Sequence, residues 1–313
     1  MRQHRLQLCA AHFVEWLTTT TQRAIETYQM FTPTDKVLVA VSGGKDSLGL
    51  WDVLLNLGYQ AEGLYINLGI DEGIGYSAQS LQMCHKFVAE HHPDARLHVI
   101  EIGGEYGRTI PILAHTERRG QRKPCSVCGL VKRHVMNRVA RDGSFAAIAT
   151  GHNLDDEAAV LLQNTLHWQA GYLARQAPVL QEREGLARKV KPLVRCYERE
   201  SAAYTLLRGI DYIYDECPFA MGATTNFYKE LLNDLELRSP GAKQQFYLHF
   251  LRAREAGWVR FEGAALPVVS AANPSAAEGV EPSGLQACSR CGQPTTAGSL
   301  CAFCRLWEDR RER

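Results

Sequence analysis

One stretch near the N-terminus, residues 36–48, constrains the fold of this chain more than any other. It begins with a β-branched apolar run at 36–41, which predicts a buried strand, and continues into Ser-Gly-Gly-Lys-Asp-Ser at 42–47. A helical pattern follows and stops at Gly58. A strand that turns through glycines into a helix presents successive backbone N–H groups, backed by the helix dipole, to an anion. The sequence therefore predicts an α/β unit with a phosphate site at its first strand-to-helix turn.

The residue types in this turn indicate which phosphate it binds. Ser42 and Ser47 supply hydroxyl donors, Lys45 adds a positive charge, and the two glycines let the backbone approach a phosphate. The turn lacks the two widely spaced glycines of the G-x-x-x-x-G-K-[ST] loop of the P-loop NTPases. The pattern is instead S-G-G-x-D-S, the pyrophosphate loop of enzymes that split ATP between its α and β phosphates. We expect ATP to bind here; the alternative is a simple glycine turn after a core strand.

The rest of the chain alternates between strand and helix patterns, which predicts a parallel sheet with helices on both faces and a ligand site beyond the carboxyl ends of the strands. The strands are expected at 36–41, 61–67, 96–102, 145–150 and 210–214, and the helices at 13–30, 47–57, 76–91, 126–141, 154–167 and 198–208. The predicted divisions are an N-terminal Cys/His segment and helix (1–34), a catalytic domain (35–221), C-terminal helices (222–261), an Ala/Pro/Ser linker (262–286) and a cysteine knuckle (287–313).

Composition and charge narrow the class of protein. No apolar run is long enough to span a bilayer and no secretory signal follows Met1, so we expect a cytoplasmic protein without membrane contact. The net charge is only +1, but 118–141 holds eight Lys/Arg and no Asp/Glu. Such a block is typical of a surface that contacts a nucleic-acid backbone, the alternative being a solvated helix face. Its members are Arg118, Arg119, Arg122, Lys123, Lys132, Arg133, Arg138 and Arg141.

Ten cysteines in a cytoplasmic chain favour metal or redox chemistry over disulfides. The C-terminal four, Cys288, Cys291, Cys301 and Cys304, have the two-knuckle spacing of a closed, structural zinc site, with two disulfides as the alternative. Cys9 and His12 form half of another zinc site. His4 is the nearest further ligand, or an upstream Cys-x2-Cys that completed the site has been lost through a late start codon. The alternative is that both are packing residues.

A third cysteine group has no partner pair. Cys125 and Cys128 form a C-x-x-C, and we pair them with the single Cys217 of Glu-Cys-Pro. Three thiolates can hold a [4Fe-4S] cluster by three irons and leave the fourth iron open. A redox pair that carries a persulfide, or a zinc site with a non-cysteine ligand, would use the same residues.

A second polar turn follows the strand expected at 145–150. Gly151-His-Asn-Leu-Asp-Asp-Glu-Ala158 places three carboxylates in the first turn of a helix, where they suit the helix dipole. Acids beside a nucleotide site also suit Mg²⁺ or ribose binding. The sequence leaves both roles open.

Together these motifs resemble the tRNA-thiolating TtcA/TtuA group of the PP-loop ATPases over nearly the whole chain, and the terminal knuckle favours the TtuA branch of 2-thiouridine synthetases. The resemblance implies a Rossmann-like, adenine nucleotide alpha hydrolase-like fold, ATP with Mg²⁺, a [4Fe-4S] cluster on Cys125, Cys128 and Cys217, and Zn²⁺ in the knuckles. It implies that the C2 oxygen of a tRNA uridine is adenylated and replaced by sulfur from a ubiquitin-like thiocarboxylate carrier, and that the enzyme forms a homodimer.

The resemblance also assigns residues. Lys132 and Asp156 would face the reacting centre beside the three cysteines, and Ile66 would lie near the adenine, with Gly151 and Asp156 near the phosphates or ribose. The loop contacts to ATP would come from Ala40, Val41, Ser42, Gly43, Gly44, Lys45, Asp46 and Ser47.

Three alternatives remain open at this point. A thiolase of the same chemistry can act on another base, such as a wobble uridine or a cytidine. A PP-loop ligase that adenylates a carboxylate would use the loop but not the three cysteines. A non-catalytic RNA-binding zinc protein would use the knuckle and the basic block but not the loop.

Overall fold

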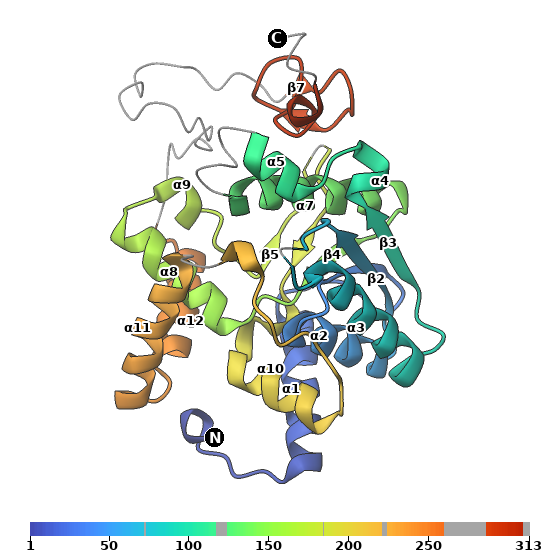
Figure 1. Cartoon of the computed structure of the whole chain (residues 1–313). Coiled ribbons are helices and arrows are strands. Elements are labelled where there is room, and N and C mark those ends of the chain that lie inside the picture. Colours follow the sequence, from blue (N-terminus) through green and yellow to red (C-terminus); the bar gives the residue numbers. More distant parts are fainter. Residues whose placement is uncertain (72, 117–123, 184, 221–223, 260–285, 309–313) are drawn as a thin grey trace.

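The centre of the fold is a six-stranded sheet in the order β3-β2-β1-β4-β6-β5 (Figure 1). The computed structural model describes residues 1–71, 73–116, 124–183, 185–220, 224–259 and 286–308. Every neighbouring pair of strands is parallel except β5 and β6, which form an antiparallel edge. The strands are β1 (Lys36–Val41), β2 (Gln60–Asn67), β3 (Leu97–Glu101), β4 (Ala147–Thr150), β5 (Val179–Leu180) and β6 (Lys189–Val190). The predicted parallel α/β fold is confirmed.

The two faces of the sheet bury different clusters, because successive side chains of a strand point to opposite sides. Val37, Val39 and Val41 of β1 belong to a large cluster that also takes in residues of α1, α2, α3 and α10. Leu38 faces the other way and packs with Ala140 near the end of α7. Helices therefore cover both faces, as expected for a parallel sheet with crossover helices.

Most of the predicted helices form within a few residues of their expected bounds. The helices are α1 (Ala10–Thr27), α2 (Lys45–Asn56), α3 (Tyr76–His91), α4 (Ile102–Tyr106), α5 (Ile110–Thr116), α7 (Pro124–Asp142), α8 (Leu154–Leu166), α9 (Ala170–Leu173), α10 (Glu198–Leu207), α11 (Thr224–Arg238) and α12 (Ala242–Glu255), with short 3-10 turns η1 (Arg2–His4), η2 (Pro192–Arg195), η3 (Pro218–Ala220) and η4 (Cys304–Trp307). The short helices α4, α5 and α9 were not expected from the sequence.

The strand predicted at 210–214 is wrong. This apolar segment runs alongside the pyrophosphate loop, where the Ile213 N–H donates to the carbonyl of Gly43 (2.9 Å), and it joins no strand ladder. The edge beyond β4 is instead taken by β6 and β5. Apolar alternation predicted a strand here because a half-buried extended segment has the same pattern whether or not it pairs.

The C-terminal part of the described chain comprises two helices and a knuckle. Helices α11 and α12 pack against α8, and the knuckle, with the small hairpin β7 (Gln286–Ala287) and β8 (Pro294–Thr295), lies next to α4, α5 and α7 (Figure 1). The linker expected at 262–286 falls almost wholly outside the described residues. Among the helices that are described, none has the length and hydropathy needed to cross a bilayer.

Candidate functional site

The pyrophosphate loop lies at the carboxyl end of β1, and its backbone is ready for an anion. Gly44 is the N-cap of α2 and offers no side-chain acceptor to the first N–H groups of the helix. Ser42 and Ser47 lie face to face, with 3.2 Å between their Oγ atoms, and the Ser47 Oγ also accepts the Ser42 N–H (3.1 Å). These contacts fix the shape of the loop before any ligand binds.

Two glycines in and beside the loop are required by close approaches. Gly43 has φ of +74°, and a Cβ on it would lie 2.4 Å from the carbonyl oxygen of Ser80 in α3. Gly151, directly after β4, would carry its Cβ 2.9 Å from the backbone of Asp46 and Ser47. Gly151 therefore lies against the loop, beside the predicted phosphate site.

Asp156 has a local structural role in addition to its predicted one. It closes a capping box on α8: the side-chain oxygen of Asn153 accepts the N–H of Asp156 (3.2 Å), while Oδ2 of Asp156 accepts the N–H of Asn153 (3.0 Å). The Asn153 amide also donates to Oδ1 of Asp46 (3.2 Å). The capping box thus ties the start of α8 to the loop.

A chain of alternating charges joins the loop to Asp156. Lys45 Nζ lies 2.8 Å from Oε1 of Glu198 in α10, and Oε2 of Glu198 lies 3.1 Å from Nζ of Lys229 in α11. Lys229 Nζ lies 2.6 Å from Oδ1 of Asp156. Neither Glu198 nor Lys229 was predicted from the sequence, because an acid at the start of one helix and a lysine within another are ordinary features of helix surfaces.

The pKa values of these groups follow from burial and from their partners. Burial opposes charge on Glu198, but Lys45 and Lys229 prevail and lower the pKa of Glu198 to about 2. Burial also opposes charge on Lys229, and Asp156 and Glu198 nevertheless hold its pKa well above the usual value. At Asp46 burial prevails over the neighbouring Lys45 and raises the carboxyl pKa.

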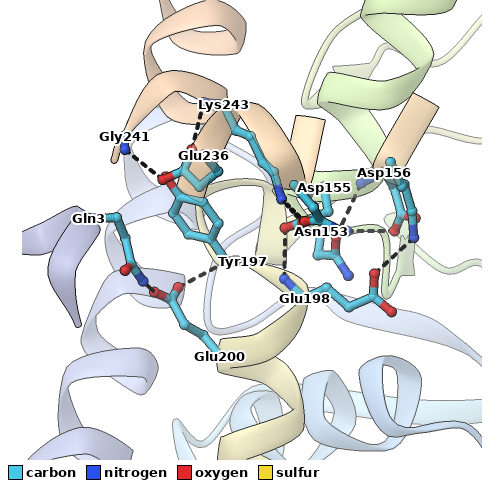
Figure 2. A network of polar contacts seen from close by, with 12 residues as sticks. Gln3, Asn153, Asp155, Asp156, Tyr197, Glu198, Glu200, Glu236, Gly241 and Lys243 are labelled. Carbon is cyan, nitrogen blue, oxygen red and sulfur yellow. Dashed lines mark hydrogen bonds and ion pairs between the residues drawn. The ribbon is translucent and has the colours of Figure 1, made fainter. Parts of the chain in front are cut away.

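The other two acids at the start of α8 are structural. Asp155 is 5% exposed, pairs with Lys243 of α12 and accepts the N–H of Glu198 (2.9 Å), as Figure 2 shows. Glu157 is 3% exposed and pairs with Lys191 (2.7 Å). Of the three acids, Asp156 is the one whose ion pair with Lys229 joins it to the charge chain that reaches Lys45.

One short segment links the loop to the cysteine group. Its start is fixed by the Ile213 bond to Gly43, and at its end the carbonyl of Phe219 accepts the Cys125 thiol (3.0 Å). Cys217 lies between these two anchors. Cys128 and Cys217 pack in the same apolar cluster. In the described part of the chain, the three sulfurs do not all lie within 4.8 Å of one another, as ligands of a single ion would.

The pKa of Cys128 reflects its burial and the groups around it. Burial is the main reason that its pKa is raised, and the Cys217 and Cys125 thiols raise it further, while Lys132 lowers it. Lys132 is exposed and lies one helical turn after Cys128 on α7. Ile66 lies near the carboxyl end of β2 and is half-buried. Its predicted contact with adenine stays a prediction, as do the roles of Lys132 and the three cysteines.

The terminal cysteines do form a tight group. The sulfurs of Cys288, Cys291, Cys301 and Cys304 all lie within 4.8 Å of one another. Backbone N–H groups point at the sulfurs, as the Cys301 N–H does toward Cys288 (3.3 Å). Burial opposes ionisation of the Cys288 thiol, but such donors prevail and lower its pKa to about 6. Four thiols at this spacing fit a closed tetrahedral metal site.

The knuckle docks on α7, the helix that begins with Cys125 and Cys128. The Phe303 ring stacks on His134 with 3.5 Å between the ring centroids, and the Gln293 amide donates to the His134 carbonyl (3.1 Å). Trp307 stacks on Tyr106 at the end of α4 (5.0 Å). The knuckle and the cysteine helix therefore share one apolar cluster.

The other predicted residues lie away from these sites or outside the described residues. Cys9 is exposed and its Sγ lies 3.2 Å from Nδ1 of His12. His4 does not join them, because its ring pairs with Glu200 (2.8 Å). Of the basic block, Lys132, Arg133, Arg138 and Arg141 are described, and Arg138 pairs with Glu105. Its first four members, Arg118, Arg119, Arg122 and Lys123, fall outside the described residues.

The fold and the loop define the class of protein. The sequence profile of the PP-loop domain family matches residues 17–232, which contain the loop, the cysteine group and Asp156. In the solved structures, the chain resembles a U34-tRNA thiolase, NcsA, from Methanococcus maripaludis, solved with its [4Fe-4S] cluster. The TM-score is 0.69 at 23% identity, over 81% of this chain and 83% of that one.

Several similar curated proteins are named for the thiolation of tRNA. A tRNA-5-methyluridine(54) 2-sulfurtransferase of Thermus thermophilus is 47% identical over 98% of this chain and 87% of the relative. Its namesake in Pyrococcus horikoshii is 41% identical over 98% and 90%. A cytoplasmic tRNA 2-thiolation protein 1 of Laccaria bicolor is 30% identical over 96% and 79%. The chain belongs to the PP-loop family and, within it, to the group of these tRNA 2-sulfurtransferases.

Proposed function

We propose that this chain is an ATP-dependent tRNA 2-sulfurtransferase that adenylates the C2 oxygen of a tRNA uridine and exchanges that oxygen for sulfur. The uridine oxygen attacks the α-phosphate of ATP and pyrophosphate leaves; sulfide then attacks C2 and AMP leaves with the oxygen. The names of the relatives favour 5-methyluridine 54 as the base. Thiolation at uridine 34, the base in the name of the more distant NcsA, would correct this assignment of the base.

The observation that carries the proposal is the segment from Ile213 to Phe219. It bonds to the pyrophosphate loop at one end and to the Cys125 thiol at the other, with Cys217 between. Six residues of chain span at most roughly 20 Å. Activation of an oxygen by ATP and delivery of sulfur by the cysteines therefore take place within the reach of one bound nucleotide. A carboxylate-adenylating ligase or an RNA-binding zinc protein has no use for this adjacency.

The protein's own groups have distinct roles in this proposal. The N–H groups at the start of α2, with Lys45, hold the phosphates and the departing pyrophosphate. Ile66 contacts the adenine at the end of β2. Asp156 and Lys132 face the reacting centre, where a carboxylate and an ammonium can manage protons and the charge that develops on the transferred oxygen.

The donor sets present in the chain fit the two metal groups. Three cysteine thiols from α7 and the segment before η3 suit a [4Fe-4S] cluster. When bound, such a cluster supplies an iron with an open position for sulfur. The four clustered thiols of the knuckle suit a structural Zn²⁺, and Cys9 with His12 would be part of a second zinc site.

The partners follow from the same assignment. A tRNA is the substrate, and the basic block at 118–141 would contact its backbone, where shape and phosphate set the affinity. A ubiquitin-like thiocarboxylate protein would supply sulfur, the enzyme would act as a homodimer, and it would work in the cytoplasm, where tRNA is modified. We also keep the predicted divisions at 34/35, 221/222, 261/262 and 286/287 as proposals.

The experiment that tests the function is a reconstituted thiolation reaction. The protein is purified and loaded with iron and sulfide without oxygen, then incubated with ATP, Mg²⁺, sulfide and tRNA that carries 5-methyluridine at position 54 but has not been thiolated. Nucleosides from the digested tRNA are separated and weighed by mass spectrometry. We expect 5-methyl-2-thiouridine from position 54 and one AMP per thiolation.

Cys217→Ala is the informative variant in this assay, with Cys196→Ala as its control because Cys196 is a fully buried cysteine whose thiol contacts Thr21 of α1 and not the loop or the other cysteines. We expect the first to lose thiolation while it still binds ATP, and the second to keep both. Thiolation by Cys217→Ala at the rate of the unaltered protein would refute the three-cysteine site. A protein that binds ATP, holds iron and forms no thiolated nucleoside would refute the function.

A further inference from the structure

Lys229 reaches from α11 to the edge of the candidate site, although α11 lies in the C-terminal helical part of the chain. Its ammonium contacts Oδ1 of Asp156 at 2.6 Å and Oε2 of Glu198 at 3.1 Å, and its side chain is only 20% exposed. The second oxygen of Asp156 accepts the N–H of Asn153. Each oxygen of the Asp156 carboxylate therefore has its own partner, one from its own helix and one from α11.

The two contacts together fix the orientation of that carboxylate. The capping bond alone would leave the carboxylate free to tilt about its Cβ–Cγ bond, whereas a second, charged partner on the other oxygen removes this freedom. Lys229 is itself fixed, because Glu198 holds it from the other side and is in turn held by Lys45 (2.8 Å). The orientation of Asp156 thus depends on a lysine that needs no contact with the nucleotide.

We propose that Lys229 is a positioning residue of the thiolation reaction, which orients the Asp156 carboxylate by an ion pair and is anchored by Glu198. The inference rests on the proposed function, in which Asp156 acts at the reacting centre. It adds a residue from α11, outside the segments that contain the loop and the three cysteines. A misplaced carboxylate slows the chemical step but leaves the phosphate contacts of the loop in place.

The test compares Lys229→Met, which removes the charge at similar length, with Lys229→Arg, which keeps it. The control is Lys86→Met, because Lys86 of α3 also bridges two carboxylates, Asp211 and Glu90, but at the surface. The reconstituted holoenzyme of each variant is assayed for thiolation at varied ATP, and its thermal midpoint is measured. We expect Lys229→Met to lower kcat about 10- to 100-fold with KM for ATP within about threefold of the original. Lys229→Arg should restore much of kcat, and Lys86→Met should change neither parameter.

Each other outcome contradicts the inference in a different way. A raised KM with unchanged kcat would make Lys229 a direct nucleotide ligand. If the thermal midpoint falls and Lys229→Arg loses as much kcat as Lys229→Met, Lys229 is a structural residue. Should Lys229→Met not fold, Lys229→Gln takes its place in the test. If Lys229→Met is as active as the unaltered protein, the inference about Lys229 is refuted and the proposed function stands. A parent protein without thiolation would refute the proposed function and, with it, this inference.

Discussion

The docked knuckle leads to a prediction about Phe303 and the cysteine helix. Phe303 is 3% exposed, stacks on His134 of α7 and contacts the rings of Tyr106 and Trp307 edge-on. Truncation of a buried phenylalanine to alanine costs about 3–5 kcal/mol. The four cysteines are untouched by Phe303→Ala, so the knuckle should keep its metal and lose its hold on α7. A loss of about 3 kcal/mol corresponds to a change of roughly 10²-fold in a local opening equilibrium.

Amide hydrogen exchange of α7, measured by mass spectrometry beside the zinc content, checks this expectation. The amides at 131–138 should exchange on the order of 10²-fold faster in Phe303→Ala, with zinc unchanged. Phe31→Ala is the matched control, because Phe31 is 8% exposed and packs edge-on against Tyr59 in the other large cluster. It should lower global stability without a selective effect on α7. Unchanged exchange at 131–138 in Phe303→Ala would show that the knuckle does not support the helix.

Three further predictions concern the loop, the cysteine group and pH. Gly43→Ala should abolish ATP binding in a calorimetric titration while the fold persists, because its Cβ would lie 2.4 Å from the Ser80 carbonyl oxygen at φ of +74°; undiminished affinity would refute the loop assignment. Cys217→Ala should lose the iron and the visible absorption of the cluster but retain zinc, by metal analysis after anaerobic reconstitution; unchanged iron would remove Cys217 from the site. The folded pKa of Glu198, about 2, lies below its usual value of 4.5, so its contribution to stability is present above pH 4.5 and is lost as the pH falls toward 2. Urea unfolding across this range should therefore show a shallower pH slope for Glu198→Gln, and identical slopes would contradict the ion pairs.

The sequence predicted the sheet, the loop and the terminal cysteine group because each depends on local rules. An apolar run that ends in Ser-Gly-Gly specifies a strand and a turn within a few residues, and C-x-x-C pairs specify ligand spacing on their own. The strand predicted at 210–214 does not form, because pairing depends on which segment lies at the sheet edge, and β6 occupies the place beside β4.

Local sequence patterns do not predict which residues contact those of the site. Glu198 and Lys229 come to the loop from two helices distant in sequence, and neither has a spacing that marks it. The docking of the knuckle on His134 also depends on tertiary contacts across more than 150 residues, as the Gln293 bond to His134 illustrates. Such contacts are set by how helices pack on the sheet, and no short sequence pattern encodes that packing.

The charge chain around the loop has a consequence for the form of ATP that the protein accepts. Three carboxylates, those of Asp46, Asp156 and Glu198, face only two ammonium groups, Lys45 and Lys229. A bare triphosphate adds several negative charges to a site that already has an excess of them, whereas its complex with Mg²⁺ brings much of the compensation with it. We therefore expect the site to favour ATP that already carries Mg²⁺, because the excess carboxylate charge repels this complex less than the bare nucleotide.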